Sequence, residues 1–198
     1  MTLGERLRLR LAGQDFQQPP PLPGDTGHDP DISALVPAAV LIAITDRPTP
    51  GLLLTQRTAH LRKHAGQVAF PGGRIDPEDA SPIDAALREA EEEIGLPRDA
   101  VEIIGTVDRY RTVTGFLVTP VIGIVQPDLP LSPHAEEVAA VFEARLTHVL
   151  DPANQILRDV LYEGRQRHYY EIFWDEFRIW GATAAMIVNL AARIGTQP

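Results

Sequence analysis

The amino-acid sequence predicts an α/β fold, a sandwich in which helices cover a mixed β-sheet. Short apolar runs typical of strands lie on both sides of an early helix over residues 82–94. A second helix, rich in Ala, Met, Ile, Val and Leu, is expected over residues 182–193, where it would cover a sheet face. The chain has 198 residues, which is long enough for one domain with its own hydrophobic core.

The composition excludes several classes of protein. The formal net charge of −9 argues against a general nucleic-acid binder. It does not argue against a phosphorylated small substrate, because a bound cation and local basic residues can invert the local field. The absence of cysteine excludes disulfides, thiol catalysis and Cys-based zinc sites. No apolar run reaches the roughly 18 residues of a membrane span, and residues 1–13 lack a signal-peptide core. We therefore expect a cytoplasmic protein with no membrane or nucleic-acid partner.

The first 37 residues are expected to form a short helix followed by an extended arm. Residues 3–12 alternate apolar and charged side chains, and residues 13–37 are rich in Pro and Gly. The arm is interpreted as packing either along the surface of the domain, residues 38–198, or against a second subunit. A homodimer is therefore one of the assemblies that the sequence leaves open.

Two strands and a glycine turn come next. Residues 38–44 form a continuous apolar run that predicts a buried strand. A turn over residues 46–51 leads to a second strand, residues 52–57, so the pair predicts a hairpin. The short apolar stretch 68–70 then precedes Pro71, Gly72 and Gly73, and paired glycines allow the backbone to approach a ligand closely.

The helix over residues 82–94 carries start and stop signals at both ends. Ser81 is a good N-cap, Pro82 suits the first helical position, and Asp84 occupies the position of a capping-box acid. Gly95 is a natural stop. One apolar face is expected, made of Ile83, Ala86, Leu87, Ala90 and Ile94.

Four glutamates lie within five positions of this helix. Glu89 and Glu93 are one turn apart on the same stripe with Glu92 next to them, whereas Glu91 points away. Like charges at i,i+4 destabilise an isolated helix, but clustered carboxylates are the ligands that Mg²⁺ prefers. Helix spacing alone leaves a solvated charged face as an equal alternative.

The glycine turn and the helix together resemble the Nudix box, the loop–helix–loop signature of hydrolases that cleave nucleoside diphosphates linked to another moiety. The matching residues are Gly72 and Gly73 followed by the run from Arg88 to Gly95. Three departures from the usual pattern occur. The spacing from Gly73 to Arg88 is one residue longer, Asp79 stands near the position of the upstream Glu, and Ala90 replaces a bulky aliphatic residue.

The preceding block resembles the additional signature of the coenzyme A pyrophosphatase branch of this family. That signature has the form LLTxR, a basic segment and GxxxFPGG, and the matching residues are Leu53, Leu54, Thr55, Arg57, Arg62, Gly66, Phe70, Pro71, Gly72 and Gly73. The longer loop that contains Asp79 is also similar to this branch. The resemblance implies the Nudix-type α/β/α sandwich with a mixed sheet.

The resemblance also implies catalytic roles for the box residues. Glu89 and Glu93 are expected to bind Mg²⁺ or Mn²⁺, and Glu92 is expected to be either a third ligand or the base that takes the proton of the attacking water. Arg88 is expected to orient the glutamates, since Arg88 and Glu92 are related as i,i+4.

Substrate binding is expected to fall to residues before the helix. Gly72 and Gly73 would shape the turn that holds the helix start. Arg57 and Arg62 would bind substrate phosphates, including the 3′-phosphate that distinguishes coenzyme A, because guanidinium groups match phosphate oxygens. Solvated loop charge is the alternative interpretation of both arginines.

After the helix, the sequence predicts strands at residues 101–107 and 116–125, and Pro120 within the second one suggests an edge strand or a bulge. A strand from 134 to 144 starts with Glu136 and Glu137, either of which is a candidate for a further carboxylate from outside the box, or merely a solvent-facing acid. A short helix at 146–150 and a hairpin of residues 156–162 and 167–173 follow. The hairpin aromatics Tyr169, Tyr170 and Phe173 are interpreted as core or cross-strand pairs rather than as side chains that stack on adenine.

The predicted function is a Mg²⁺- or Mn²⁺-dependent pyrophosphohydrolase. The resemblance implies that it cleaves the diphosphate of coenzyme A or its derivatives to 3′,5′-ADP and 4′-phosphopantetheine. Two alternatives stay open: a Nudix hydrolase of another nucleoside diphosphate derivative, such as ADP-ribose or a dinucleoside polyphosphate, and a non-catalytic nucleotide-binding Nudix module. Intact box glutamates argue against the second alternative.

Overall fold

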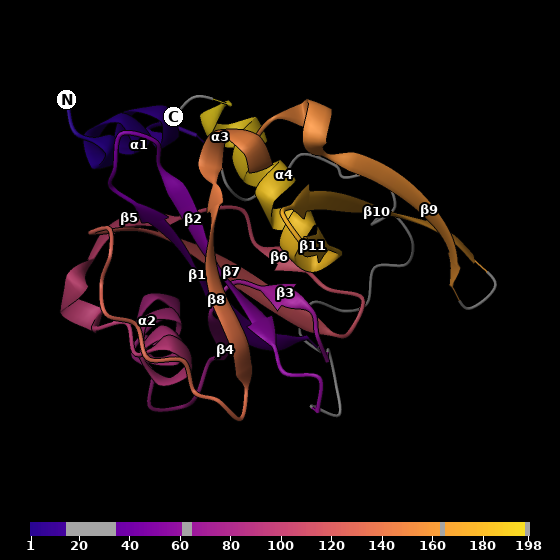
Figure 1. Cartoon of the computed structure of the whole chain (residues 1–198), viewed down its shortest axis with the longest axis horizontal. Helices are drawn as coiled ribbons and strands as arrows, with labels where there is room; N and C mark the ends of the chain where they lie inside the picture. Colours follow the sequence, from indigo (N-terminus) through magenta and orange to yellow (C-terminus); the bar gives the residue numbers. More distant parts are fainter. Residues whose placement is uncertain (15–34, 61–64, 163–164, 197–198) are drawn as a thin grey trace.

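A large mixed sheet separates two helical layers. The computed structural model describes residues 1–14, 35–60, 65–162 and 165–196, and for residues 162 and 165–167 it describes the backbone alone. Helix α2 (Pro82–Ile94) covers one face of the sheet, and helix α4 (Ala182–Ile194) lies on the other side (Figure 1). The predicted α/β class with a mixed sheet is therefore confirmed.

The main sheet has eight strands in the described residues: β1 (Val36–Thr45), β2 (Gly51–Arg57), β3 (Val68–Ala69), β4 (Gly72–Arg74), β5 (Val101–Thr106), β6 (Tyr110–Arg111), β7 (Phe116–Val125) and β8 (Val138–Arg145). The central pair, β1 and β7, is parallel along its whole length, from Val36 opposite Phe116 to Thr45 opposite Val125. The other pairs are antiparallel, including the predicted hairpin of β1 and β2, in which Ile44 lies opposite Leu52.

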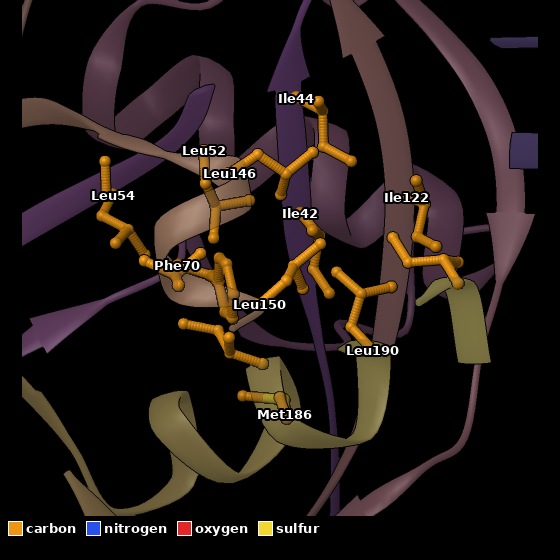
Figure 2. Packing of buried hydrophobic residues seen from close by; sticks show 14 of the residues in the cluster. Ile42, Ile44, Leu52, Leu54, Phe70, Ile122, Leu146, Leu150, Met186 and Leu190 are labelled. Atoms are coloured by element: carbon orange, nitrogen blue, oxygen red, sulfur yellow. The ribbon is translucent and has the colours of Figure 1, made fainter. Parts of the chain in front are cut away.

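Each face of the sheet has its own hydrophobic core. On the α2 face, the small side chains Ala85, Ala86 and Ala90 pack against β1 and β7. On the opposite face, α4 supplies the buried side chains of Met186 and Leu190. The short helix α3 (Leu146–Val149) supplies Leu146, and Leu150 follows this helix directly. All four side chains are labelled in Figure 2. The prediction that the terminal helix covers a sheet face is confirmed.

The N-terminal helix α1 (Leu3–Leu11) belongs to the second core. Leu3, Leu7 and Leu11 are buried, and α1 lies beside α4 and β5. The short helix predicted for residues 3–12 is thus confirmed. Residues 15–34, which make up most of the predicted arm, lie outside the described residues, and the division of the chain at residue 37 stays a prediction.

A second, three-stranded sheet follows β8. It contains β9 (Ile156–Tyr162), β10 (Arg165–Trp174) and β11 (Phe177–Trp180) in the order β11-β10-β9. The β9–β10 hairpin confirms the hairpin prediction and projects away from the body of the molecule (Figure 1). Two short 3₁₀ turns, η2 (Arg98–Ala100) and η3 (Pro152–Asn154), complete the elements. None of the described helices is long and apolar enough to cross a membrane.

Of the two alternatives predicted for Pro120, the edge strand is wrong, whereas the pairing of β7 with β5 does contain a register shift close to it, between Ile103 and Gly105. Pro120 lies within β7, which is paired with β1 on one side and with β5 and β6 on the other. Its carbonyl accepts a hydrogen bond from the amide of Val107, in the interval between β5 and β6. The N–H and C=O of one strand residue point to the same side, so the missing donor of Pro120 faces the place where the neighbouring strand is interrupted.

The strand predicted to begin at residue 134 begins at Val138. The amides of Glu137 and Val138 donate to the carbonyl of His134, which closes a turn before the strand. The amide of His134 donates to the carbonyl of Glu93 at 2.8 Å. The turn before β8 is therefore attached to the C-terminal end of α2.

Candidate active site

Local signals fix both ends of α2. The Ser81 hydroxyl accepts a hydrogen bond from the amide of Asp84 at 3.2 Å, and Pro82 occupies the first turn. The Asp84 carboxylate accepts a bond from the Ser81 hydroxyl at 2.6 Å, so it supports the cap through the side chain. Gly95 ends the helix in the left-handed conformation. The predicted start and stop are confirmed.

The glycine turn places backbone atoms that carry no side chain directly against α2. Gly72 and Gly73 form the start of β4, which pairs with β1. Gly72 has φ +155°, and a Cβ there would clash with the carbonyl oxygen of Ala39, so only glycine fits. Its amide donates to Glu93 Oε2 at 3.1 Å. A Cβ on Gly73 would lie 2.5 Å from the Glu89 carboxyl group. Each glycine therefore faces one of the two glutamates that were predicted to share a stripe.

Glu93 is the most deeply buried acid of the helix. Its residue is 6% exposed, and burial raises the pKa of its carboxyl to about 7. The amide of Gly72 and the cation of Arg57 oppose this rise in pKa, whereas the charges of Glu89 and Glu137 reinforce it. Burial also raises the pKa of Glu89. The two carboxylates thus lie side by side in a poorly solvated place.

Arg57 reaches this pair from the end of β2. Its Nη1 lies 3.6 Å from Glu93 Oε1. Its Nε is buried and has no hydrogen-bond partner among the described residues. A buried guanidinium nitrogen without an acceptor is costly unless a further acceptor arrives, so Arg57 is suited to an anionic ligand. Arg62, the other predicted phosphate-binding residue, lies outside the described residues.

Arg88 is held by Asp79 and in turn holds two glutamates. Its Nε and Nη2 donate to the two Asp79 oxygens at 3.0 and 2.9 Å, a bidentate pair. Its Nη1 donates to Glu89 at 2.9 Å and to Glu92 at 3.1 Å. The hydrogen bonds from Arg88 lower the pKa of Asp79, and the bonds to Asp79 raise the pKa of Arg88. The orienting role of Arg88 stays a prediction, and these hydrogen bonds are the contacts that it requires.

The loop around Asp79 positions the Asp79 carboxylate for Arg88, a role that the sequence did not indicate. Asp76 and Asp79 bond each other: the amide of Asp76 donates to Asp79 Oδ2 at 2.8 Å, and the amide of Asp79 donates to the carbonyl of Asp76 at 3.0 Å. This closed turn presents both Asp79 oxygens to the guanidinium. The upstream position of Asp79 was the available signal, but its partner could not be identified from spacing alone.

The other two glutamates of the run lie on more exposed parts of the helix. The Glu92 side chain is 60% exposed, and among the described residues Arg88 is its one ion-pair partner. Glu91 pairs with Arg98 at 2.7 Å, on the side that spacing predicted to point away. The structure therefore brings Glu89 and Glu93 together in the protected part of the site, with Glu92 at its rim.

The turn before β8 contributes one further acid. The charge of Glu137 raises the pKa of Glu93. The carbonyls of Glu136 and Glu137 accept hydrogen bonds from the hydroxyl and the amide of Thr58, the residue after Arg57. Of the two acids that the sequence left as alternatives, Glu137 is the one whose charge acts on the buried carboxylate.

The donor set fits a hard divalent cation. Glu89 and Glu93 offer carboxylate oxygens with side chains 19% and 8% exposed, and a cation would relieve the mutual repulsion of their charges. Among the described residues, no three His, Cys, Asp or Glu side chains come close enough to enclose a metal ion. A site with few protein oxygens suits Mg²⁺, which usually binds one or two carboxylates together with substrate phosphates and water.

Comparisons of sequence and structure show which known proteins this chain resembles. The profile of the NUDIX domain matches residues 35–168. The protein named "Uncharacterized Nudix hydrolase NudL" from Escherichia coli (strain K12) is 52% identical over 161 residues, which cover 81% of this chain and 84% of that protein. The protein of the same name from Shigella boydii serotype 4 matches to the same extent. The crystal structure of a MutT/nudix family protein from Enterococcus faecalis matches with a TM-score of 0.51 at 15% identity, over 98% of this chain and 74% of that one, and so shows a shared fold.

Proposed function

The chain belongs to the Nudix family and is a hydrolase of a nucleoside diphosphate derivative, and from this premise we propose that its substrate is coenzyme A or a coenzyme A derivative. The products would be 3′,5′-ADP and 4′-phosphopantetheine, and the cofactor would be Mg²⁺ or Mn²⁺. A cytoplasmic location and a small-molecule substrate, with no nucleic-acid or membrane partner, are part of this proposal.

One observation carries the proposal. The block that resembles the coenzyme A pyrophosphatase signature meets the Nudix box at a single carboxylate, that of Glu93. Arg57, from the LLTQR segment, lies 3.6 Å from one Glu93 oxygen, and the amide of Gly72, from the FPGG segment, donates to the other. Substrate recognition and metal binding would therefore share one local structure.

Glu89 and Glu93 are the residues that would hold the metal ion, with Glu92 as a third candidate. A divalent cation at this place would neutralise phosphate charge and lower the pKa of a coordinated water molecule. Arg88 keeps Glu89 and Glu92 oriented through one nitrogen, Nη1. Because Asp79 fixes that guanidinium on its other edge, the two carboxylates are positioned before substrate binds.

Arg57 would bind the substrate diphosphate. Its guanidinium group would donate to a phosphate oxygen, and its charge would offset part of the negative charge that the diphosphate brings to a site already rich in carboxylates. Arg62 stays a predicted phosphate ligand. The proton of the attacking water would be accepted by Glu92 or Glu137, since both are carboxylates at the border of the site.

A substrate panel tests the proposal. Purified protein with Mg²⁺ is incubated with coenzyme A, ADP-ribose and a dinucleoside polyphosphate, and the products are separated by chromatography. We expect cleavage of coenzyme A with release of 3′,5′-ADP. If coenzyme A stays intact while ADP-ribose is hydrolysed, the substrate assignment is wrong. Full activity of both Glu89→Gln and Glu93→Gln would contradict the metal assignment.

A further inference from the structure

The turn before β8 is anchored to the residue that carries the most deeply buried carboxylate of the site. The amide of His134 donates to the main-chain carbonyl of Glu93 at 2.8 Å. Carbonyls in the last turn of a helix lack partners within the helix, so this contact satisfies one of them. The amides of Glu137 and Val138 then both donate to the carbonyl of His134 at 2.9 Å. The turn over residues 134–137 therefore starts on the helix that carries the candidate metal ligands.

Thr58 holds the other side of this turn with its amide and its hydroxyl. The amide donates to the carbonyl of Glu137 at 2.9 Å, and the hydroxyl donates to the carbonyl of Glu136 at 3.0 Å. Thr58 directly follows β2 and is only 8% exposed. A buried hydroxyl that loses its acceptor is costly, so the pair of bonds fixes the position of the turn relative to the end of β2.

A β-bulge brings the same turn closer to Arg57. Gln56 lies opposite Ala140, but Arg57 lies opposite Val138, so Ala139 has no partner on β2. Val138 is buried in the core on the α2 face of the sheet, where an uninterrupted register would place Ala139. The extra residue therefore moves the start of β8, and the turn before it, one position along β2 toward Arg57.

These contacts close a ring around the carboxylate of Glu93. The ring runs from the main-chain carbonyl of Glu93 through the turn to Thr58. Arg57, the residue before Thr58, returns to the start, since its Nη1 lies 3.6 Å from Glu93 Oε1. Glu137 is part of this ring, and its charge raises the pKa of Glu93. The ring thus joins a guanidinium group and a further acid to one buried carboxylate.

We propose that Thr58 is a positioning residue of the active site, which holds Glu137 beside Glu93 by fixing the turn before β8. This inference rests on the proposed function, in which Glu92 and Glu137 are the alternative acceptors of the proton from water, and it selects Glu137. The side chain of Glu92 is 60% exposed, whereas backbone hydrogen bonds on two sides fix the turn that carries Glu137. A hydroxyl that only stabilised the end of a strand would affect stability and not turnover.

Kinetics of two isosteric variants tests the inference. Thr58→Val removes the hydroxyl bond and keeps the amide bond. We expect kcat to fall about fivefold, the effect of one hydrogen bond, with KM unchanged, and to recover in Thr58→Ser. The matched control is Thr183→Val on the other side of the sheet, because Thr183 is 7% exposed and its hydroxyl donates to the carbonyl of Val68, also at 3.0 Å. This control should lose similar thermal stability and keep the kcat of wild type. An unchanged kcat in Thr58→Val, or an equal loss in the control, would overturn the inference.

A double-mutant cycle identifies the carboxylate through which Thr58 acts. Thr58→Val is combined with Glu137→Gln and, separately, with Glu92→Gln, and rate constants are measured in single turnovers with enzyme in excess, so that slow variants are included. We expect the loss caused by Thr58→Val to disappear in the Glu137→Gln background and to persist in the Glu92→Gln background. Losses that add in the Glu137→Gln background, or full activity of Glu137→Gln alone, would reject the inference.

Hydrogen exchange tests the same contact without catalysis. In mass spectrometry of the folded proteins, the segment that contains Glu137 and Val138 should exchange faster in Thr58→Val than in wild type or Thr183→Val, because the turn opens more often. Equal exchange in all three proteins would reject the inference, whatever the substrate. If coenzyme A stays intact while ADP-ribose is cleaved, the substrate assignment alone fails, and the cycle with ADP-ribose still decides the role of Thr58.

Discussion

Replacing Glu93 by Gln should stabilise the metal-free protein at alkaline pH while it removes activity. The carboxyl of Glu93 is buried, and its pKa in the folded protein is about 7, compared with an ordinary value of 4.5. Gln has nearly the same shape, and its amide oxygen can still accept the hydrogen bond from Gly72. The variant therefore removes the charge and little else.

The sign and size of the effect follow from the two pKa values. Between pH 4.5 and 7 the folded protein keeps a proton that the unfolded chain has released, so the free energy of unfolding falls as pH rises through this range. Each pKa unit corresponds to about 1.4 kcal/mol, so ionised Glu93 lowers the free energy of unfolding by about 3 kcal/mol above pH 7. Glu89 acts in the same direction, whereas the lowered pKa values of Asp79 and Glu171 act only at more acidic pH.

Urea denaturation in EDTA at pH 5 and pH 8 measures this difference. We expect wild type and Glu93→Gln to have similar free energies of unfolding at pH 5, and the variant to be about 3 kcal/mol more stable at pH 8. Glu91→Gln is the control on the same helix, because Glu91 is exposed and pairs with Arg98, and its pH dependence should match that of wild type. The reasoning is refuted if the advantage of Glu93→Gln is the same at both pH values, or if the variant is the less stable protein at pH 8.

Three further predictions concern the surroundings of Glu89 and Glu93. Asp79→Asn should lower kcat at least about tenfold, because the bidentate contact with Arg88 is lost; a kcat equal to that of wild type in steady-state assays would show that Asp79 does not position the site. Gly73→Ala should lower activity strongly with a small change in melting temperature, since the new Cβ meets the flexible carboxyl group of Glu89; activity and thermal melting are compared on the same sample, and unchanged activity would contradict the predicted contact. Arg57→Gln should raise KM about tenfold and leave the Mg²⁺ concentration for half-maximal activity nearly unchanged. An unchanged KM together with a higher Mg²⁺ concentration for half-maximal activity would assign Arg57 to the metal site.

Features with local causes could be predicted from the sequence. The ends of α2 follow from Ser81, Pro82 and Gly95, whose hydrogen bonds and backbone conformations involve only neighbouring residues. The stripe of Glu89 and Glu93 follows from helix periodicity in the same way. Sequence therefore indicated which carboxylates come together, because the helix itself sets their spacing.

Features that depend on distant segments could not be predicted. The acid Asp108 is buried and binds Arg193 of α4, 85 positions later in the chain, at 2.6 Å. The partners of Glu171 come from two other strands, and the pairing of those strands decides the contact. Residue patterns along the chain specify which faces are apolar, but they do not specify which charged side chains meet across elements.

Two errors have physical reasons as well. Pro120 was interpreted by the rule that Pro avoids central strands, which fails here because the neighbouring strand is interrupted beside it. Strand β11 was not predicted because it has only four residues. It forms by pairing back onto β10 across a tight turn in which Asp175 has φ +48°. The alternation of Phe177, Arg178 and Ile179 was the available signal.

Product analysis with purified protein, Mg²⁺ and coenzyme A tests the central claim most directly. Chromatography with mass detection should show 3′,5′-ADP and 4′-phosphopantetheine in equal amounts, with formation abolished by EDTA, restored by Mg²⁺ or Mn²⁺, and lost in Glu93→Gln. Coenzyme A that remains intact with either metal, in a preparation that hydrolyses ADP-ribose, would contradict the account.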